Sequence, residues 1–176
     1  MVRRWFGIAG LLALLVSAGC LFGPSRGPKI LGYQHGTVLL TTGERYQVGP
    51  LTDEWLEERP SRHVVGFRDR ERGAIITTSA WCGAHFEDLP LTALMGHLFA
   101  GIELVRVDPA IAFSLDGRGA LRTRSLRRID GVVMQTDAVV VKKDGCNFDF
   151  YLIARPEDAT VLTPVFERFV HGFRFH

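Results

Sequence analysis

The 176-residue sequence lacks the features of a nucleic-acid-binding protein or a nucleotide-dependent enzyme. Its formal net charge is only +2, whereas a nucleic-acid-binding domain needs a basic face or stripe to contact phosphates. It contains no glycine-rich phosphate loop and no dinucleotide fingerprint. We therefore expect no nucleic-acid partner and no cofactor.

A long apolar run is also missing. The apolar segment that follows Arg3 and Arg4 has about a dozen residues, and a permanent membrane-spanning helix needs roughly 20. A basic start, a short apolar run and the small residues Ser17-Ala18-Gly19 are typical of a secretory signal peptide. We expect residues 1–19 to be such a signal, and the mature chain to be near neutral because both arginines leave with it.

The residue after this signal is a cysteine. Leu14-Leu15-Val16-Ser17-Ala18-Gly19-Cys20 resembles the lipobox of bacterial lipoproteins. That family carries acyl chains such as palmitate on this cysteine, so the resemblance implies a membrane anchor at Cys20. Leu21, in place of an aspartate, implies by analogy the outer membrane, with the domain facing the periplasm. The alternative is a plain signal peptide with an incidental cysteine.

Only two other cysteines occur, Cys82 and Cys146. In an oxidising cell envelope such a pair predicts one disulfide bond. It would close a loop of about 65 residues and stabilise the fold by about 4 kcal/mol on the chain-entropy estimate. Two buried free thiols are the alternative.

The mature chain divides into two parts. Residues 20–43 are rich in glycine and proline, which predicts a lipidated cysteine followed by a flexible tether. Residues 44–176 form a single domain, in which 52–58 is expected as a charged turn. Strands are expected at 44–48, 63–68, 74–82, 103–107, 110–115, 119–129, 132–142 and 146–154. Asp-Gly pairs at 116–117, 130–131 and 144–145 predict tight hairpin turns.

Two segments have helical spacing of apolar residues. Residues 89–101 have a proline in the first turn and a glycine at the end. Residues 157–173 are the second, although Pro164 allows a later start. The expected strands are connected as hairpins, with one helix inserted midway along the chain and one at the C-terminus. This order of elements predicts an α+β fold, in which an antiparallel β-sheet is flanked by helices.

The order of elements resembles the PsbP-like sandwich, shared by the extrinsic photosystem II subunit and the Ran-binding Mog protein. The segments that carry the resemblance are Leu115–Arg122, Ile129–Val132, Val139–Phe150 and Phe166–Phe173. The family implies an αβα sandwich with a binding or assembly role. It implies no shared catalytic residues, and fold alone does not establish function.

Cys82-Gly83-Ala84-His85 is the one motif in which a cysteine and a histidine are close enough in sequence to suggest a metal site or a catalytic pair. Together with Cys146 and His97 or His63 it could ligate zinc, and Cys82 beside His85 could act as a nucleophile. A disulfide between the two cysteines removes both sulfurs from either chemistry. We therefore expect no metal and no enzymatic activity.

Four arginines on one expected strand are separated by even numbers of residues, so their side chains point to the same side of the sheet. They are Arg118, Arg122, Arg124 and Arg128. They could bind anionic groups of a partner. The alternative is a solvated face whose arginines pair with acids on neighbouring strands.

The phenylalanines of the C-terminal part are expected in the core, or lining a pocket for an acyl chain. Taken together, the sequence predicts a lipid-anchored envelope lipoprotein whose non-enzymatic domain binds an envelope protein partner, as an accessory of a larger envelope or transport complex. The alternative is a periplasm-facing binder of lipid or another small amphiphile.

Overall fold

The computed structural model describes residues 27–82 and 89–176. The expected signal peptide, Cys20 and His85 lie outside these residues. Strands contain 54% of the described residues and helices 14%. No helix among them is long and apolar enough to span a membrane.

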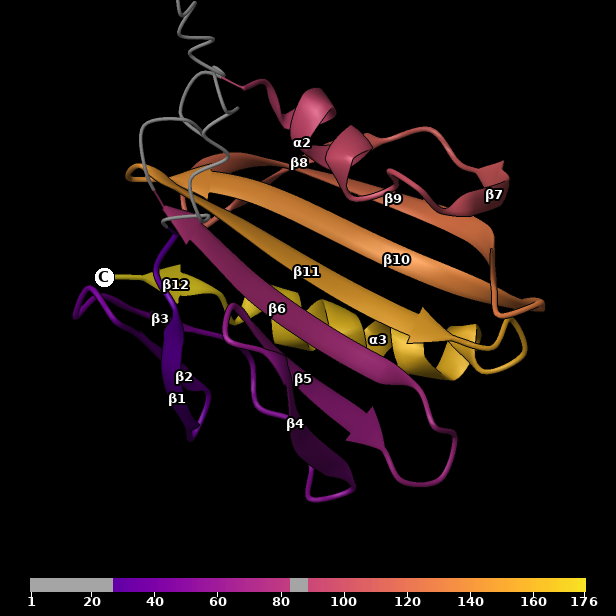
Figure 1. Cartoon of the computed structure of the whole chain (residues 1–176), viewed down its shortest axis with the longest axis horizontal. Helices are drawn as coiled ribbons and strands as arrows, with labels where there is room; N and C mark the ends of the chain where they lie inside the picture. Colours follow the sequence, from indigo (N-terminus) through magenta and orange to yellow (C-terminus); the bar gives the residue numbers. More distant parts are fainter. Residues whose placement is uncertain (1–26, 83–88) are drawn as a thin grey trace, which may run out of the picture.

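Eight antiparallel strands form the larger sheet (Figure 1). In sheet order they are β4 (Trp55–Ser61), β5 (Val64–Asp69), β6 (Ile75–Cys82), β11 (Cys146–Ala154), β10 (Val132–Lys143), β9 (Arg118–Ile129) and β7 (Glu103–Val107), while β8 (Ile111–Leu115) also pairs with β9. Both residues of each Asp-Gly pair at 116–117, 130–131 and 144–145 have positive φ. Two-residue hairpin turns require that conformation. The hairpins predicted from these pairs are confirmed.

A second, smaller sheet consists of β1 (Ile30–Gln34), β2 (Thr37–Leu40), β3 (Arg45–Gln47) and β12 (Arg174–Phe175). Two of its strands lie in the segment that we expected to be a flexible tether, and that expectation is wrong for residues 30–40. Val38 and Leu40 are fully buried, so this segment is part of the domain. Strand β12, at the C-terminus, pairs with β3, so the C-terminal residues form part of this smaller sheet (Figure 1).

Two helices, α2 (Leu91–His97) and α3 (Ala159–His171), pack on opposite faces of the larger sheet (Figure 1). Leu91 and Met95 of α2 contact Ala138 and Val140 of β10. The buried residues of α3 belong to the main core on the other face. Helix α3 begins five residues before Pro164 and continues through it, so the later start is not observed.

The expected α+β sandwich, with helices as layers on either side of a sheet, is wrong. The protein is mostly antiparallel β-sheet, and its two helices have only 7 and 13 residues. The extra strands come from segments without a strand-like pattern: β1 and β2 from the expected tether, and β4 from the expected charged turn at 52–58.

The main core lies between the larger sheet, α3 and the smaller sheet. Phe148, Phe150, Phe166, Phe169 and Phe173 are fully buried there. Their rings contact one another mostly edge-on or tilted, as in Phe148–Phe173 at 4.8 Å and Phe150–Phe173 at 5.5 Å. Most C-terminal phenylalanines are therefore core residues, as expected, although Phe166 also reaches a cavity.

Candidate functional site

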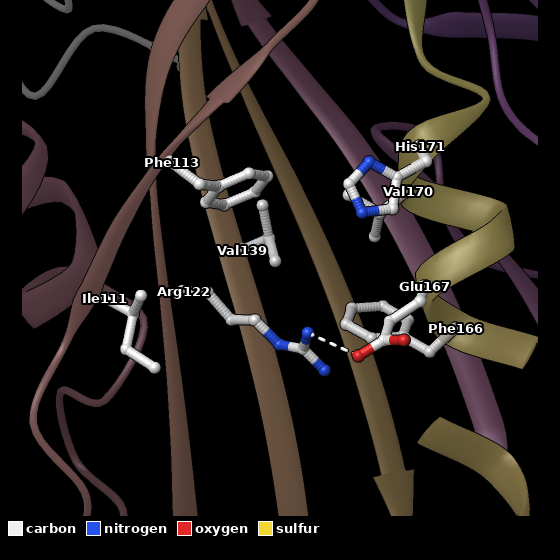
Figure 2. A pocket seen from close by; sticks show the side chains of 8 residues that line it. All are labelled: Ile111, Phe113, Arg122, Val139, Phe166, Glu167, Val170 and His171. Atoms are coloured by element: carbon white, nitrogen blue, oxygen red, sulfur yellow. Dashed lines mark hydrogen bonds and ion pairs between the residues drawn. The ribbon is translucent and has the colours of Figure 1, made fainter. Parts of the chain in front are cut away.

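A cavity of about 240 Å³ opens between α3 and strands β8, β9 and β10 (Figure 2). Ile111, Phe113, Arg122, Val139, Phe166, Glu167, Val170 and His171 line it. Its surface is mainly apolar, and the His171 ring meets Phe113 edge-on at 6.2 Å. An apolar hollow with a few polar groups at its border is the usual form of a site for a small ligand.

The polar border of this cavity is an ion-pair network. Arg122 Nε donates to Asp137 Oδ1 at 2.7 Å, and its Nη1 donates to Glu167 Oε1 of α3 at 2.8 Å. Arg124 Nε donates to Asp137 Oδ2 at 3.1 Å. The hydrogen bond that Arg122 donates to Asp137, helped by the one that it donates to Glu167, raises the pKa of Arg122 above its ordinary value. Asp137 is fully buried, and the guanidinium groups of Arg122 and Arg124 compensate its charge.

Two further hollows continue along the same face of β9. One of about 170 Å³ shares Ile111 and Arg122 with the apolar cavity. It shares Asp108 and Arg124 with a polar one of about 360 Å³ that reaches the start of α3. The three form a groove between α3 and the sheet edge, apolar at one end and polar at the other. We call it the α3 groove.

The structure places all four predicted arginines on one face of β9 and gives each a carboxylate. Besides the Arg122 and Arg124 contacts, Arg118 Nη2 donates to Asp144 at 2.9 Å and Arg128 Nε to Glu103 at 3.2 Å. This is the arrangement of the alternative hypothesis, a charged face paired with neighbouring acids. Arg118, Arg124 and Arg128 remain about half exposed.

Sequence reasoning did not identify Asp137, Glu167 or His171. A signal for Asp137 was present, because the Asp130-Gly131 turn sets the register that pairs Asp137 with Arg124. No local signal identifies Glu167 and His171. They reach the site only because α3 packs against the sheet.

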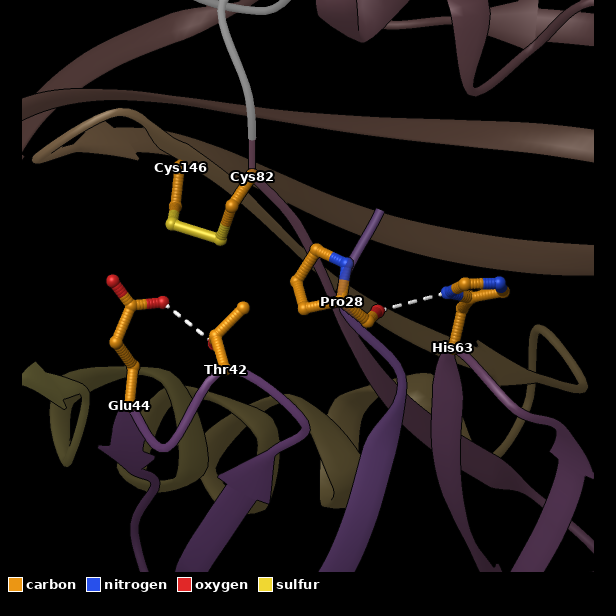
Figure 3. The surroundings of a disulfide bond; sticks show 6 residues. All are labelled: Pro28, Thr42, Glu44, His63, Cys82 and Cys146. Carbon is orange, nitrogen blue, oxygen red and sulfur yellow. Dashed lines mark hydrogen bonds between the residues drawn. A yellow bond between two sulfur atoms is a disulfide. The ribbon is translucent and has the colours of Figure 1, made fainter. Parts of the chain in front are cut away.

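Cys82 and Cys146 form a disulfide bond, as predicted (Figure 3). They lie directly opposite each other on the paired strands β6 and β11. The Glu44 carboxylate lies within 4.8 Å of both sulfurs, but sulfurs bonded to each other are not thiolate ligands.

The other zinc-site candidates do not join this cluster. Nδ1 of His63 lies 2.9 Å from the Pro28 carbonyl oxygen (Figure 3), and its ring stacks on Trp81. His97 ends α2 on the opposite face of the sheet from the core that contains Cys146. The structure therefore brings together the two cysteines and leaves both histidines apart from them.

A buried polar layer lies on the α2 face of the sheet. Asp149 accepts hydrogen bonds from Ser79 Oγ at 3.1 Å and Asn147 Nδ2 at 3.2 Å. Burial raises the pKa of Asp149 to about 6, although those hydrogen bonds act in the opposite direction. Burial likewise lowers the pKa of Arg127, which lies under Phe99. This layer has no histidine or free thiol among the described residues that contact Asp149.

No family model matches the sequence, and no curated protein is similar to it in sequence. Solved structures are similar in fold. LpqN, which is involved in cell envelope biogenesis of Mycobacterium tuberculosis, matches with a TM-score of 0.56 at 13% identity, over 74% of this chain and 82% of that one. Cyanobacterial PsbP (CyanoP) from Synechocystis sp. PCC 6803 matches with a TM-score of 0.54 at 17% identity, over 92% and 99%.

A protein of unknown function from Pseudomonas aeruginosa, PA94, has a TM-score of 0.53 at 12% identity, over 82% of this chain and 94% of that one. At these identities the likeness shows the fold alone. It supports the PsbP-like part of the predicted resemblance, and one structural neighbour is an envelope protein.

Proposed function

We propose that the protein is a lipid-anchored lipoprotein of the bacterial cell envelope, and that its domain is not an enzyme but a binding domain accessory to a larger envelope or transport complex. Cys20 carries the acyl chains, and the domain faces the periplasm from the outer membrane. The observation that carries the proposal is the Cys82–Cys146 disulfide, because disulfides persist in oxidising compartments such as the periplasm. The fold shared with LpqN, an envelope biogenesis protein, is consistent with this location.

The same bond argues against the enzyme hypothesis based on Cys82. A nucleophilic cysteine must be a free thiolate, and Cys82 is bonded to Cys146. The arginines of β9 have carboxylate partners, which suits a structural or binding surface. A binding role therefore explains more of the arrangement than catalysis does.

The anchor is tested by Cys20→Ala in the native host. We expect this variant to lose acyl labelling and to leave the membrane fraction, because two or three acyl chains are what hold such a protein at a bilayer. Cys82→Ala is the matched control and should keep both properties. A Cys20→Ala protein that stays acylated in the membrane would contradict the proposal.

The partner is tested by crosslinking in intact cells, followed by detergent purification and mass spectrometry of proteins and lipids. A stoichiometric envelope protein supports the accessory role. Recovery of the lipoprotein without any protein partner contradicts it.

A second candidate function is the binding of a small amphiphile, favoured by the apolar end of the α3 groove. Val170 lines that cavity, so Val170→Trp should fill it and displace a bound acyl chain. Val161→Trp is the control, since Val161 lies on the same helix but is 59% exposed. Native mass spectrometry should find lipid on the wild type and on the control but not on Val170→Trp. Equal lipid on all three contradicts this candidate.

A further inference from the structure

One arginine of the larger sheet is buried without an ion pair. Arg127 of β9 lies on the α2 face, against the ring of Phe99 in the turn that follows α2, and it is only 3% exposed. Among the described residues no carboxylate forms an ion pair or hydrogen bond with it. A buried charge is normally paired, so an unpaired one needs a specific explanation, and a bound ligand is one.

The unpaired atoms of Arg127 lie on one edge of its guanidinium group. They are Nε and Nη2, and both are buried. This edge can donate two parallel hydrogen bonds to the two oxygens of a carboxylate or phosphate group. Arg122 uses the same two atoms to bind both oxygens of Asp137. Arg68 uses them to bind both oxygens of Glu58.

Two further buried donors lie on the same face as Arg127. Ser125 is two residues away on β9, so its side chain points in the same direction, and Thr136 lies directly opposite Ser125 on β10. Ser125 Oγ and Thr136 Oγ1 are buried and have no hydrogen-bond partner in the described part of the chain. The three residues together supply a positive charge and several donors. An anion with two or more oxygens supplies the matching negative charge and acceptors.

We propose that Arg127, Ser125 and Thr136 form a buried binding site for a carboxylate or phosphate group. The Nε and Nη2 atoms of Arg127 donate to two oxygens of the ligand, and the two hydroxyl groups donate to the same group. Arg127 and Arg122 are an odd number of residues apart on β9, so their side chains lie on opposite faces of the sheet. The site is therefore separate from the α3 groove.

The buried carboxylate of Asp149 on this face is too far away to serve as the counter-ion. Asp149 lies opposite Val140 of β10, whereas Arg127 lies opposite Met134. Six residues separate these two positions, which is about 20 Å along a strand. Asp149 therefore does not compete with a ligand for Arg127.

The surroundings of the site are apolar. The partly buried ring of Phe99 covers the guanidinium group and packs against the apolar cluster between α2 and the sheet. A ligand that enters the site displaces this ring, and a hydrocarbon chain attached to the bound group can lie against the cluster. The headgroup of an anionic amphiphile is thus one source of the carboxylate or phosphate, and a small soluble anion is the other.

The test is isothermal titration calorimetry of the full chain in non-ionic detergent, with sodium octanoate, sodium acetate and sodium phosphate as probes. The wild type should bind at least one of them. Arg127→Met should weaken this binding by about tenfold or more, because it removes the charge and both donors. Arg128→Met is the matched control and should bind like the wild type, since Arg128 is the next residue and points to the opposite face.

The three probes distinguish the two sources of the anionic group. Octanoate that binds much more tightly than acetate and phosphate indicates the headgroup of an amphiphile. Acetate or phosphate that binds as tightly as octanoate indicates a small soluble anion. Either result, together with the loss in Arg127→Met, supports the site.

Two further variants assign the binding to these residues. Ser125→Ala/Thr136→Val should weaken it severalfold, because both hydroxyl donors are removed. Val170→Trp, which fills the α3 groove, should leave it unchanged. Circular dichroism should show the same fold in all variants.

Three results would each overturn the proposal. The first is a wild type that binds none of the probes. The second is Arg127→Met that binds as tightly as the wild type, or no more weakly than Arg128→Met. The third is binding that is lost in Val170→Trp and kept in Arg127→Met, which would assign the ligand to the α3 groove instead.

Discussion

The guanidinium carbon of Arg127 lies 5.1 Å from the centre of the Phe99 ring. Arg127 is only 3% exposed, and its Nε and Nη2 have no hydrogen-bond partner among the described residues. A buried charge without a counter-ion costs several kcal/mol, and contact with an aromatic face returns about 2 kcal/mol when desolvated. The guanidinium group is therefore held at a net cost to stability.

Arg127→Met should accordingly raise the free energy of unfolding, by about 1–2 kcal/mol, because an apolar side chain of similar length replaces a poorly compensated ion. Urea denaturation measures this change. Phe99→Leu should destabilise the wild type more than it destabilises Arg127→Met, and a double-mutant cycle gives the coupling. A large loss of stability in Arg127→Met would show that an unseen group compensates the charge.

Asp149 should make stability depend on pH. Its pKa is about 6 in the folded protein against an ordinary 3.8, so between these pH values the folded state binds the additional proton. Stability therefore falls as pH rises from about 4 to about 6 and is level above that, with a total change on the order of 3 kcal/mol.

Asp149→Asn isolates this effect, because it has no titrating group at this position. The difference in unfolding free energy between the variant and the wild type should grow across the same pH interval in favour of the variant. A difference that stays constant from pH 4 to pH 7 would contradict the raised pKa.

Removing the disulfide should cost about 4 kcal/mol on the chain-entropy estimate, because the bond closes a long loop in the unfolded chain; Cys82 and Cys146 are 64 residues apart. Cys82→Ala/Cys146→Ala is the variant to measure by denaturation. Wild type treated with a reductant should show a similar loss. An unchanged midpoint in both samples would indicate that the bond adds nothing to stability.

Asp137→Ala should destabilise the domain by about 3–5 kcal/mol, since it leaves Arg122 and Arg124 without their buried carboxylate. Glu167→Ala should cost less than about 1 kcal/mol, because the Glu167 side chain is 42% exposed. Thermal or urea denaturation compares the two. Equal losses of stability in the two variants would mean that the burial of a carboxylate does not determine how much its ion pairs contribute.

The hairpins of the larger sheet could be predicted because their determinants are local. Each Asp-Gly pair sets a two-residue turn, and the turn sets which residues face each other. Strand β4 could not be predicted, because charged residues on an edge strand remove the apolar alternation by which a strand is identified. Strands β1 and β2 are short and lie among glycines, so the composition of their segment indicated a tether.

The candidate site was only partly predictable for a related reason. The arginines of β9 were evident from their parity, whereas the cavity depends on how α3 packs against β8 and β10. That packing is set by contacts between residues far apart in the chain. Sequence periodicity gives each element an apolar face, but it does not determine where the faces leave a hollow.

The position of β1 limits how far the domain can extend from a membrane. If Cys20 is the anchored residue, ten residue steps separate it from Ile30, where the first strand begins. Even a fully extended chain covers at most about 35 Å in that many steps. The protein would thus be confined to a thin layer next to its bilayer. Any partner would have to reach into that layer to bind the domain.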